Sequence, residues 1–500
     1  MQLHTGTGWR TSPQVSARAG GEDRGLSMLP YRPMPPALRL AANTAFTLKR
    51  RQFLATLSYL GMPVWAGAAA GATASAATAA TTVTTRPAPG AAIPIGGALR
   101  VDNAAVWQRI VQEAGGAGSR FAVLATAAAN PERSAQRISQ ALQRAGAQTE
   151  VIPVAPRQAD SDWQRLRDDP ALAARVASMQ GVFFSGGAQE LIVDTLQPQG
   201  RETALLQAIR SLQARGGVVA GTSAGAAIMS DWMFRDAQDP LAVLKGRLRQ
   251  GQEIDRGLGF AGPALFVDQH FLRRGRIGRL LPVMVDKGYR WGLGVEEDSA
   301  AIVHGDQIEV IGARGALLVD LAGATSQGWP SATGVGSPPF SLRGAALSFL
   351  DRGDRFDLGQ ARLLPAAEKL AGPIDPNATG FKPYFSHGGN HPDLLGDNAI
   401  VHAMTRLVDS PDREARGLVF NGRALQGADA QDEQPALGFE FRLYKGADTL
   451  AWFTSAWGGE DYSVHRIYLD VKPVRMAQPL YRPWAMQPES AVQTQPQPQR

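Results

Sequence analysis

The stretch VVAGTSAGAAIMSD at residues 218–231 decides the fold, because it joins an apolar strand to a helix through a serine between glycines. Its centre, GTSAG at 221–225, fits the G-x-S-x-G elbow, in which a strained strand-to-helix turn exposes the serine hydroxyl. The N-terminus of the following helix would favour a developing oxyanion. Ser223 is therefore a candidate nucleophile. The alternative is a glycine-rich turn that only packs a helix on a sheet.

Apolar runs and amphipathic stretches alternate on both sides of this motif, from about residue 96 to 304. The pattern predicts an α/β fold with a parallel sheet and helices on both faces. Such sheets bind ligands at the carboxyl ends of their strands. The expected strands lie at 120–128, 148–154, 181–187 and 218–221, and the expected helices at 132–146 and 202–217.

Two further strand ends in this predicted sheet supply a base and an acid. His270 lies in LFVDQHFLRRGRIGRLL, directly after an apolar strand-like run, and another apolar strand in WGLGVEEDSAAIVHGD ends with Glu296, Glu297 and Asp298. A carboxylate there would orient the imidazole and stabilise its charged form. The order Ser, His, Glu along the chain differs from the Ser, acid, His order of α/β-hydrolases. A structural role is the alternative for a lone histidine.

The ending YSVHRIYLDVKPV resembles that of secreted cyanophycinases. Four further stretches together resemble the cyanophycinases, in the serine peptidase family that includes aspartyl dipeptidase E. They are GVFFSGGAQ, GGVVAGTSAGAAIMSD, VDQHFLRRGRIGRLL and GLGVEEDSAAIV. The resemblance implies a flavodoxin-like, doubly wound, mainly parallel sheet related to class I glutamine amidotransferases. It also implies hydrolysis of cyanophycin, a poly-aspartate with arginine on each β-carboxyl, to β-Asp-Arg dipeptides.

The resemblance assigns the catalytic roles. Ser223 would be the nucleophile, His270 the general base and Glu297 the orienting acid. Adjacent Glu296 is the less favoured acid, since strand alternation lets only one of the two face the site. No metal or organic cofactor is required.

The resemblance also implies the groups that hold the substrate. Backbone N–H groups near Gly187 and Ala224 would form the oxyanion hole, and Gln189 would contact substrate. Ala188 departs from the family, in which an aspartate usually stands at this position, so we expect altered substrate contacts there. Asp268 and Gln269 flank His270 and would position it or bind the arginine side chain of the substrate.

An arginine series follows His270 at spacings of four, six and nine: Arg274, Arg276 and Arg279. Guanidinium groups bind carboxylates bidentately, so the series would suit a substrate built of aspartate. A solvated basic helix face is the alternative. Arg273 breaks the spacing and is interpreted as a surface charge.

The N-terminal region predicts export. Residues 1–77 are interpreted as a leader with a twin-arginine-type signal: Arg50-Arg51, an apolar small-residue stretch and alanine-rich cleavage sites near 74–77. We therefore expect a periplasmic or extracellular protein. A chance arginine pair before a buried helix is the alternative. The apolar stretch is short and glycine-rich, so we expect no stable membrane span. Residues 78–95 are interpreted as a flexible linker.

Charge and composition exclude several classes of protein. Residues 1–51 hold eight Lys and Arg against two acidic residues, which accounts for the whole formal excess of +6 in the chain. The remainder is neutral, so nucleic acid is not an expected partner. The chain has no cysteine, which excludes disulfides and the cysteine nucleophile of an amidotransferase.

After the predicted catalytic domain at 96–304, strand-like alternation indicates a β-rich C-terminal segment at 305–483, interrupted by a helix near 392–408. It would bind polymer or form a structural cap. Its aromatic residues suggest a binding face or ordinary packing: Trp452, Trp457 and Tyr462. His387 and His391 lie four apart near Asp393, but intervening glycines favour a loop over a metal site. Residues 484–500 are interpreted as a disordered tail.

The sequence therefore predicts an exported serine exopeptidase acting on cyanophycin or another β-aspartyl peptide. Two alternatives remain open: a β-aspartyl or N-terminal-Asp dipeptidase of the same fold, and a binding homologue without turnover. A homodimer also remains an open expectation.

Overall fold

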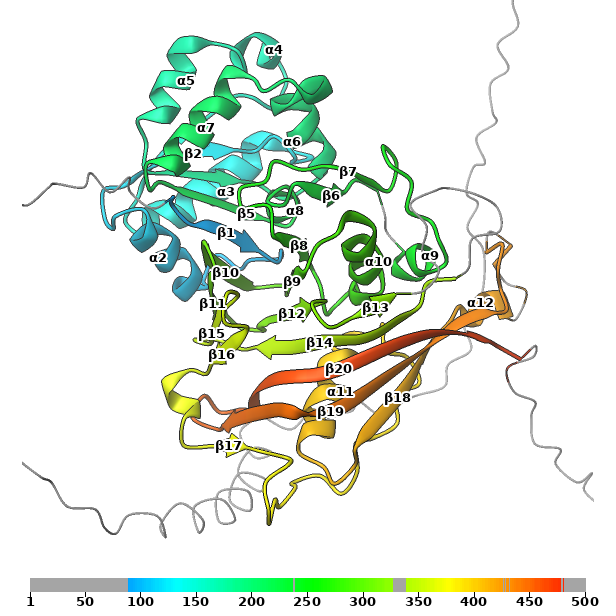
Figure 1. Cartoon of the computed structure of the whole chain (residues 1–500). Helices are drawn as coiled ribbons and strands as arrows, with labels where there is room; N and C mark the ends of the chain where they lie inside the picture. The colour runs from blue at the N-terminus through cyan, green and yellow to red at the C-terminus, as the bar shows by residue number, and fades with distance from the viewer. Residues whose placement is uncertain are drawn as a thin grey trace, which may run out of the picture. The chain divides into compact units, whose positions relative to one another are not determined.

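The computed structural model describes residues 89–480, except 237–238, 327–338, 426, 428, 431 and 478–479. The expected leader at 1–77, the linker as far as residue 88 and the tail at 484–500 lie outside these residues. The described part contains two nine-stranded sheets and one two-stranded sheet (Figure 1). The helices within it are all too short or too polar to span a lipid bilayer.

The first sheet is parallel on one side and antiparallel on the other. In the parallel half the strand order is β1-β5-β4-β2-β3, and the order reverses between β2 and β4, as in a doubly wound sheet. These strands are β1 (Ala92–Ile95), β2 (Arg120–Leu124), β3 (Gln148–Val151), β4 (Gly181–Phe184) and β5 (Val218–Thr222).

Helices cover both faces of the parallel half, which confirms the predicted α/β fold. Val123 and Phe183 share an apolar cluster with α2 and α3, whereas their neighbours Leu124 and Phe184 share another with α5, α6 and α7. This division follows from the alternation of side chains along a strand. The helices are α2 (Ala104–Glu113), α3 (Pro131–Arg144), α4 (Trp163–Leu166), α5 (Pro170–Ala177), α6 (Gln189–Leu196) and α7 (Ala204–Ala214).

The prediction of a flexible linker at 78–95 is wrong at its C-terminal end, where residues 92–95 form strand β1. Residues 92–95 are fully buried and pair in parallel with β5 and antiparallel with β10. The run AIPI was hidden by the alanine, proline and glycine residues around it, and it is only four residues long. A central strand therefore begins where the sequence suggested a flexible segment.

The predicted domain boundary at 304/305 is also corrected, because the two sheets exchange strands across it. The first sheet continues from β1 through β10 and β11 to β15 and β16, so it takes strands from beyond residue 305. The second sheet begins with β8 and β9 and continues through β12 and β14 into the C-terminal segment. The added strands are β8 (Leu265–Gln269), β9 (Trp291–Val295), β10 (Ser299–His304), β11 (Gln307–Gly312), β12 (Ala316–Asp320), β14 (Leu342–Leu350), β15 (Arg355–Asp357) and β16 (Arg362–Leu364).

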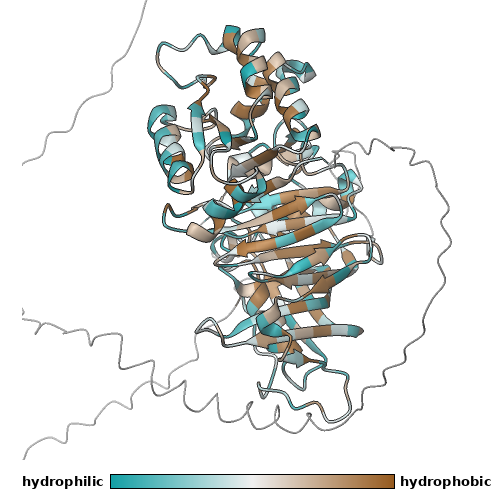
Figure 2. Cartoon of the chain, turned by 90° about the vertical axis from the view of Figure 1, so that its left-hand side faces the viewer, coloured by the Kyte–Doolittle hydropathy of each residue, from teal (hydrophilic) through white to brown (hydrophobic). Residues whose placement is uncertain are grey.

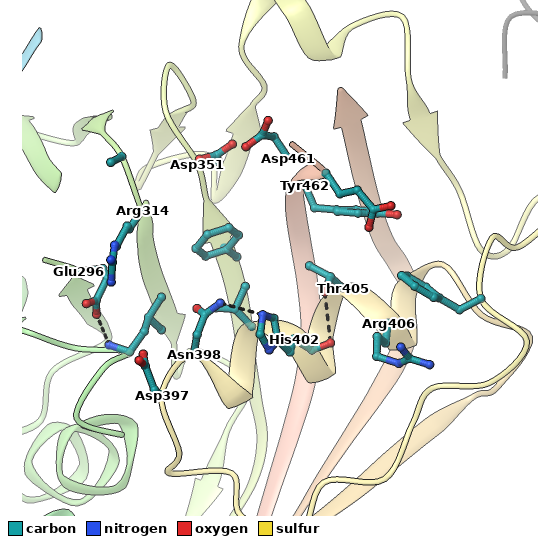
Figure 3. A pocket seen from close by; sticks show the side chains of 16 residues that line it. Glu296, Arg314, Asp351, Asp397, Asn398, His402, Thr405, Arg406, Asp461 and Tyr462 are labelled. Atoms are coloured by element: carbon teal, nitrogen blue, oxygen red, sulfur yellow. Dashed lines mark hydrogen bonds between the residues drawn. The ribbon is translucent and has the colours of Figure 1, made fainter. Parts of the chain in front are cut away.

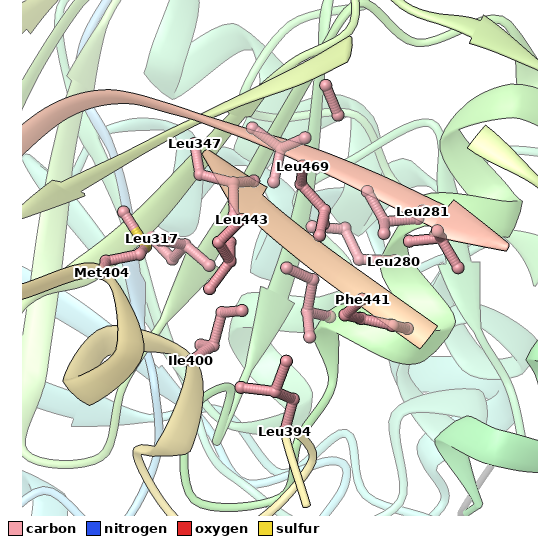
Figure 4. Packing of buried hydrophobic residues seen from close by; sticks show 14 of the residues in the cluster. Leu280, Leu281, Leu317, Leu347, Leu394, Ile400, Met404, Phe441, Leu443 and Leu469 are labelled. Carbon is pink, nitrogen blue, oxygen red and sulfur yellow. The ribbon is translucent and has the colours of Figure 1, made fainter. Parts of the chain in front are cut away.

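One apolar core joins the second sheet to helix α10 (Ile277–Lys287). Leu280 and Leu281 of α10 share this cluster with Leu347 of β14, Leu443 and Leu469 (Figure 4). Figure 2 shows long apolar stretches along the strands in the middle of the described part. Burial of this shared surface holds the C-terminal segment on the helix that follows His270.

The remaining elements complete the C-terminal side. The helix expected at 392–408 is shorter, because residues 392–398 form a loop in which Asn398 has a φ of 57°. The other elements are β6 (Trp232–Phe234), α9 (Pro240–Leu244), β7 (Ile254–Arg256), β13 (Thr325–Ser326), β17 (Pro373–Ile374), α11 (Ala399–Val408), β18 (Glu414–Val419), α12 (Gly422–Leu425), β19 (Leu437–Thr454) and β20 (Asp461–Arg475).

Candidate active site

Three strand ends meet at the carboxyl end of β1. The carbonyl of Ile95 accepts the N–H of Ser223 at 2.9 Å, and the carbonyl of Gly96 accepts the N–H of His270 at 2.7 Å. The carbonyl of Gly97 accepts the N–H of Asp298, directly after Glu297, at 2.9 Å. Three consecutive carbonyls thus hold the ends of β5, β8 and β9. The sequence placed the three groups in one sheet, but β5 belongs to the first sheet and β8 and β9 to the second.

Ser223 occupies the predicted elbow. Its φ of 53° lies in the left-handed region, which a non-glycine residue adopts only when its surroundings enforce it. The flanking glycines allow this close packing. A Cβ on Gly221 would lie 2.4 Å from the carbonyl oxygen of Gly225, and a Cβ on Gly225 would lie 2.7 Å from that of Phe184. The following helix, α8 (Ala224–Ala227), is only one turn long, so its dipole contributes less than the sequence suggested.

A hydrogen-bonded chain connects serine, histidine and glutamate. Ser223 Oγ lies 2.9 Å from His270 Nε2, and His270 Nδ1 lies 2.7 Å from Glu297 Oε1. A neutral imidazole that donates from Nδ1 to Glu297 leaves Nε2 free to accept the serine hydroxyl. Glu296 points elsewhere, because its Oε2 accepts the backbone N–H groups of Leu272 and Arg273. Of the two candidate carboxylates, only Glu297 contacts the histidine.

The surroundings of His270 favour the neutral form of its imidazole. Burial lowers the pKa of His270, and the positive charges of Arg274 and Arg276 lower it further. The hydrogen bond from Glu297 opposes this effect without reversing it. An imidazole with a pKa below its usual value is ready to accept a proton at neutral pH.

Gly97 makes room for the histidine. A Cβ at this position would lie 2.3 Å from both Cε1 and Nε2 of His270, and the φ of Gly97 is 108°. Both the space and the backbone conformation therefore require glycine. Sequence reasoning missed this residue, because its partner lies more than 170 positions away along the chain.

The predicted oxyanion-hole residues lie on both sides of the serine. Ala224 follows it directly at the start of α8. Gly187 lies in the loop after β4, and a Cβ on the preceding Gly186 would be 3.2 Å from Ser223 Cβ. Gly187 itself has a φ of 140° and is pressed against the carbonyl of Ala127. The loop therefore lies against the side chain of Ser223.

Most of the predicted substrate-binding arginine series lies in the interior, which corrects our expectation. Arg276 and Arg279 are 4% and 2% exposed, and both pair with Asp268, which is 1% exposed. Burial raises the pKa of Asp268, but the charges of Arg279 and Arg276 more than offset this and leave the pKa below its usual value. Arg276 also donates to the carbonyl of Gln269 at 2.7 Å. These residues form a buried ion cluster that holds the backbone next to His270 in place.

The other predicted substrate contacts have different surroundings. Gln269 is 3% exposed, so it is interior as well. Gln189 donates from Nε2 to the carbonyl of Phe234 at 2.7 Å and lines a cavity of about 750 Å³ beside Gly187 and Ala188. Arg274 is exposed and remains the one member of the series that is open to solvent.

Arg273 has a role that the spacing argument overlooked. Its guanidinium lies 3.7 Å from Glu297 Oε2 and 3.5 Å from Asp397 of the C-terminal segment. Half of the Arg273 side chain is exposed, so these ion pairs are weak individually. No sequence pattern could have found them, since Asp397 lies more than 120 residues further along.

The remaining sequence candidates lie away from the triad. The His391 ring bonds to the carbonyl of Gly388. Within the described ranges, no three His, Cys, Asp or Glu side chains are grouped to hold a metal ion. The three aromatic residues form no common exposed face, because Tyr462 is buried and Trp452 packs against the core. The ring of Trp457 stacks with Arg352.

Replacement of Gly97 by alanine should displace the imidazole by about an ångström and slow labelling of Ser223 by a serine-directed fluorophosphonate about 100-fold. Gly115→Ala is the matched control, since Gly115 has a φ of 103° with nothing within 4 Å of its missing Cβ. Equal labelling rates for the two variants would show that Gly97 does not set the position of His270.

The sequence is similar to that of known peptidases. A profile of peptidase family S51 matches residues 93–311. A cyanophycinase from Geminocystis herdmanii is 30% identical over 275 residues, which cover 53% of this chain and 93% of that protein. A cyanophycinase from Trichormus variabilis is 28% identical over 287 residues, which cover 56% of this chain and 90% of that protein.

Among solved structures, a peptidase from an acI-B1 Actinobacterium aligns with a TM-score of 0.37 at 19% identity, over 54% of this chain and 97% of that one. The sequence similarity covers nearly the full length of the curated relatives, and the matched residues contain Ser223, His270 and Glu297. The chain therefore belongs to peptidase family S51 and is a serine peptidase.

Proposed function

We propose that this protein is an exported exopeptidase that hydrolyses cyanophycin to β-Asp-Arg dipeptides, with Ser223, His270 and Glu297 as its catalytic triad. The observation that carries the proposal is the hydrogen-bonded chain from Ser223 Oγ through His270 to Glu297. Similarity to cyanophycinases over most of their length supports the choice of substrate. Export is supported by the twin-arginine-type leader.

The geometry supports acyl transfer through a serine ester. His270 Nε2 takes the Ser223 proton, and the alkoxide attacks a backbone carbonyl of the substrate. The N–H groups near Gly187 and Ala224 stabilise the oxyanion. The imidazolium, stabilised by Glu297, then protonates the leaving amine, and water hydrolyses the acyl-enzyme with His270 again acting as base.

The exposed surface near the triad suits an acidic backbone. Arg274 is a solvent-accessible guanidinium whose charge lowers the pKa of His270, and we assign it to a carboxylate of the substrate. The cavity beside Gln189 is lined in part by the loop after β4, which lies against Ser223. Its lining carries both positive and negative side chains, including Arg235, Arg249 and Glu190. Ala188 also lines it, which removes a negative charge from the position where the family usually carries aspartate. We therefore assign this cavity to the charged side chain of the substrate.

A direct assay tests the proposed function. We expect the purified protein to release soluble β-Asp-Arg from insoluble cyanophycin, measured by mass spectrometry, and Ser223→Ala to lose at least about 10³-fold in rate. Folding of both proteins is checked by circular dichroism. A folded protein that leaves the polymer intact but cleaves β-aspartyl dipeptides would replace the proposal with the dipeptidase alternative.

The pH dependence should respond to Arg274. The kcat/KM of the wild type should rise through the pKa of His270, which lies below the usual value for histidine. Arg274→Gln removes a positive neighbour that disfavours the imidazolium, so the pKa should rise and the acidic limb should move a few tenths of a pH unit upward. Arg133→Gln, an exposed position on α3, is the control. A limb that stays in place in Arg274→Gln would remove Arg274 from the electrostatics of the base.

A further inference from the structure

A second cavity lies on the side of Glu296 that faces the C-terminal segment. It has a volume of about 770 Å³, within the usual range for small-molecule sites. Figure 3 shows the walls of this cavity. Glu296 and Arg314 lie next to strands β9 and β12 of the second sheet, and Asp397 to Arg406 lie along α11 and its preceding loop. Asp351, Asp461 and Tyr462 lie at the opposite end. Most of this lining lies beyond the residues matched by the family profile.

Negative charge predominates in this cavity. Five carboxylates line it, whereas the lining arginines are Arg314 and Arg406. Three of the carboxylates have a cation within 4 Å, but two of those cations are shared. Lys369 divides its charge between Asp351 and Asp354, and Arg273 divides its charge between Asp397 and Glu297. The five lining carboxylates are Glu296, Asp351, Asp397, Glu460 and Asp461.

Two carboxylate oxygens in the lining lack a hydrogen bond. Glu296 is only 3% exposed, and its Oε1 has no partner among the described residues. The Oδ2 of Asp461 has none there either, although Arg352 lies 3.3 Å from its Oδ1. Figure 3 shows the carboxylates of Asp351 and Asp461 beside each other at one end of the cavity. Buried acceptors without a donor are costly, so rotation of either side chain that brings its free oxygen to a ligand N–H group in the cavity would be favoured.

The shape and chemistry of the lining favour an organic cation. The described residues contain no group of three ligating side chains close enough for a metal ion, so the carboxylates are too dispersed to coordinate one. A planar guanidinium carries five N–H donors and spans separated acceptors. The cavity also contains the rings of Phe349, Phe385 and Tyr462, on which a guanidinium can stack.

We propose that this cavity is a binding site for a guanidinium group, separate from the catalytic serine. The guanidinium would lie between Asp351 and Asp461 at one end, and Arg314 and Arg406 would receive a carboxylate carried by the same ligand. Arginine residues and arginyl peptides have this combination of groups. Two sources share the chemistry: the arginine side chains of the polymer and the soluble dipeptide product. Only this choice of source rests on the proposed function.

Binding without turnover tests the site. Agmatine and L-arginine are titrated into the purified protein by calorimetry, and both should bind. Asp461→Asn keeps the shape of the side chain and removes its charge, so it should weaken agmatine binding at least about tenfold. Asp448→Asn is the matched control, because Asp448 is an ion-paired carboxylate of β19 outside the cavity. Glu460→Gln, an exposed lining position, serves if Asp461→Asn fails to fold, and it should also weaken binding.

A further arm distinguishes the two ligand sources. The Ser223→Ala protein is sedimented with insoluble cyanophycin, with and without Asp461→Asn. Reduced co-sedimentation of the double variant identifies a polymer-binding site, whereas loss of agmatine binding alone identifies a product site. Absence of agmatine binding at millimolar concentration, or equal binding by wild type, Asp461→Asn and Glu460→Gln, would overturn the proposal. Because the titration involves no hydrolysis, its outcome is independent of whether the enzyme degrades cyanophycin.

Discussion

The carboxyl end of β1 is the constraint on which the site depends. Ile95, Gly96 and Gly97 present three successive carbonyls, and each one holds the backbone of a different strand end. Those strand ends carry Ser223, His270 and Glu297. Because consecutive carbonyls have fixed separations, the backbone sets the spacing of the three side chains before their own hydrogen bonds form. The 2.9 Å and 2.7 Å contacts of His270 therefore depend on the fixed spacing of these three backbone carbonyls.

A buried ion cluster next to His270 stabilises this arrangement. Asp268 immobilises Arg276 and Arg279, and Arg276 in turn bonds to the carbonyl of Gln269, the residue before His270. Loss of one partner in such a buried cluster typically costs several kcal/mol, because it leaves an uncompensated charge. Arg276 thus influences both the position and the pKa of the histidine, and Arg279 helps to balance the charge of Asp268.

The C-terminal segment is joined to the candidate active site by strand pairing and by a backbone hydrogen bond. Strand β9, which ends two residues before Glu297, pairs with β12; β12 pairs with β14, and β14 pairs with β20. The loop before α11 also contacts the histidine loop, since Asn398 donates its N–H to the carbonyl of Leu272. The segment therefore supports the base and the acid, and it encloses the carboxylate-lined cavity next to them.

Local patterns predicted the parts of the site that are encoded locally. The GTSAG elbow, the apolar strands and the strand-end positions of His270 and Glu297 all depend on short-range sequence, and the structure places them as expected. Strand alternation predicted that only one of Glu296 and Glu297 would face the site, and the family resemblance selected Glu297. The prediction failed where long-range pairing decides.

The four residues of β1 are a strand only because β5 and β10 flank them. The arginine spacing is equally compatible with a solvated face and a buried cluster, and Asp268 decides between the two. Gly97 and Arg273 meet partners far away in the sequence, so no local signal marks them.

The central claim is that Ser223, His270 and Glu297 act as one unit, and a double-mutant cycle tests it most directly. The kcat of Ser223→Ala, His270→Ala and the double variant is measured with the same substrate, after folding has been verified. Our account predicts that the double variant is about as slow as either single variant, because each removes the whole nucleophilic pathway. Losses that multiply would contradict it, since they would mean that the two residues contribute independently.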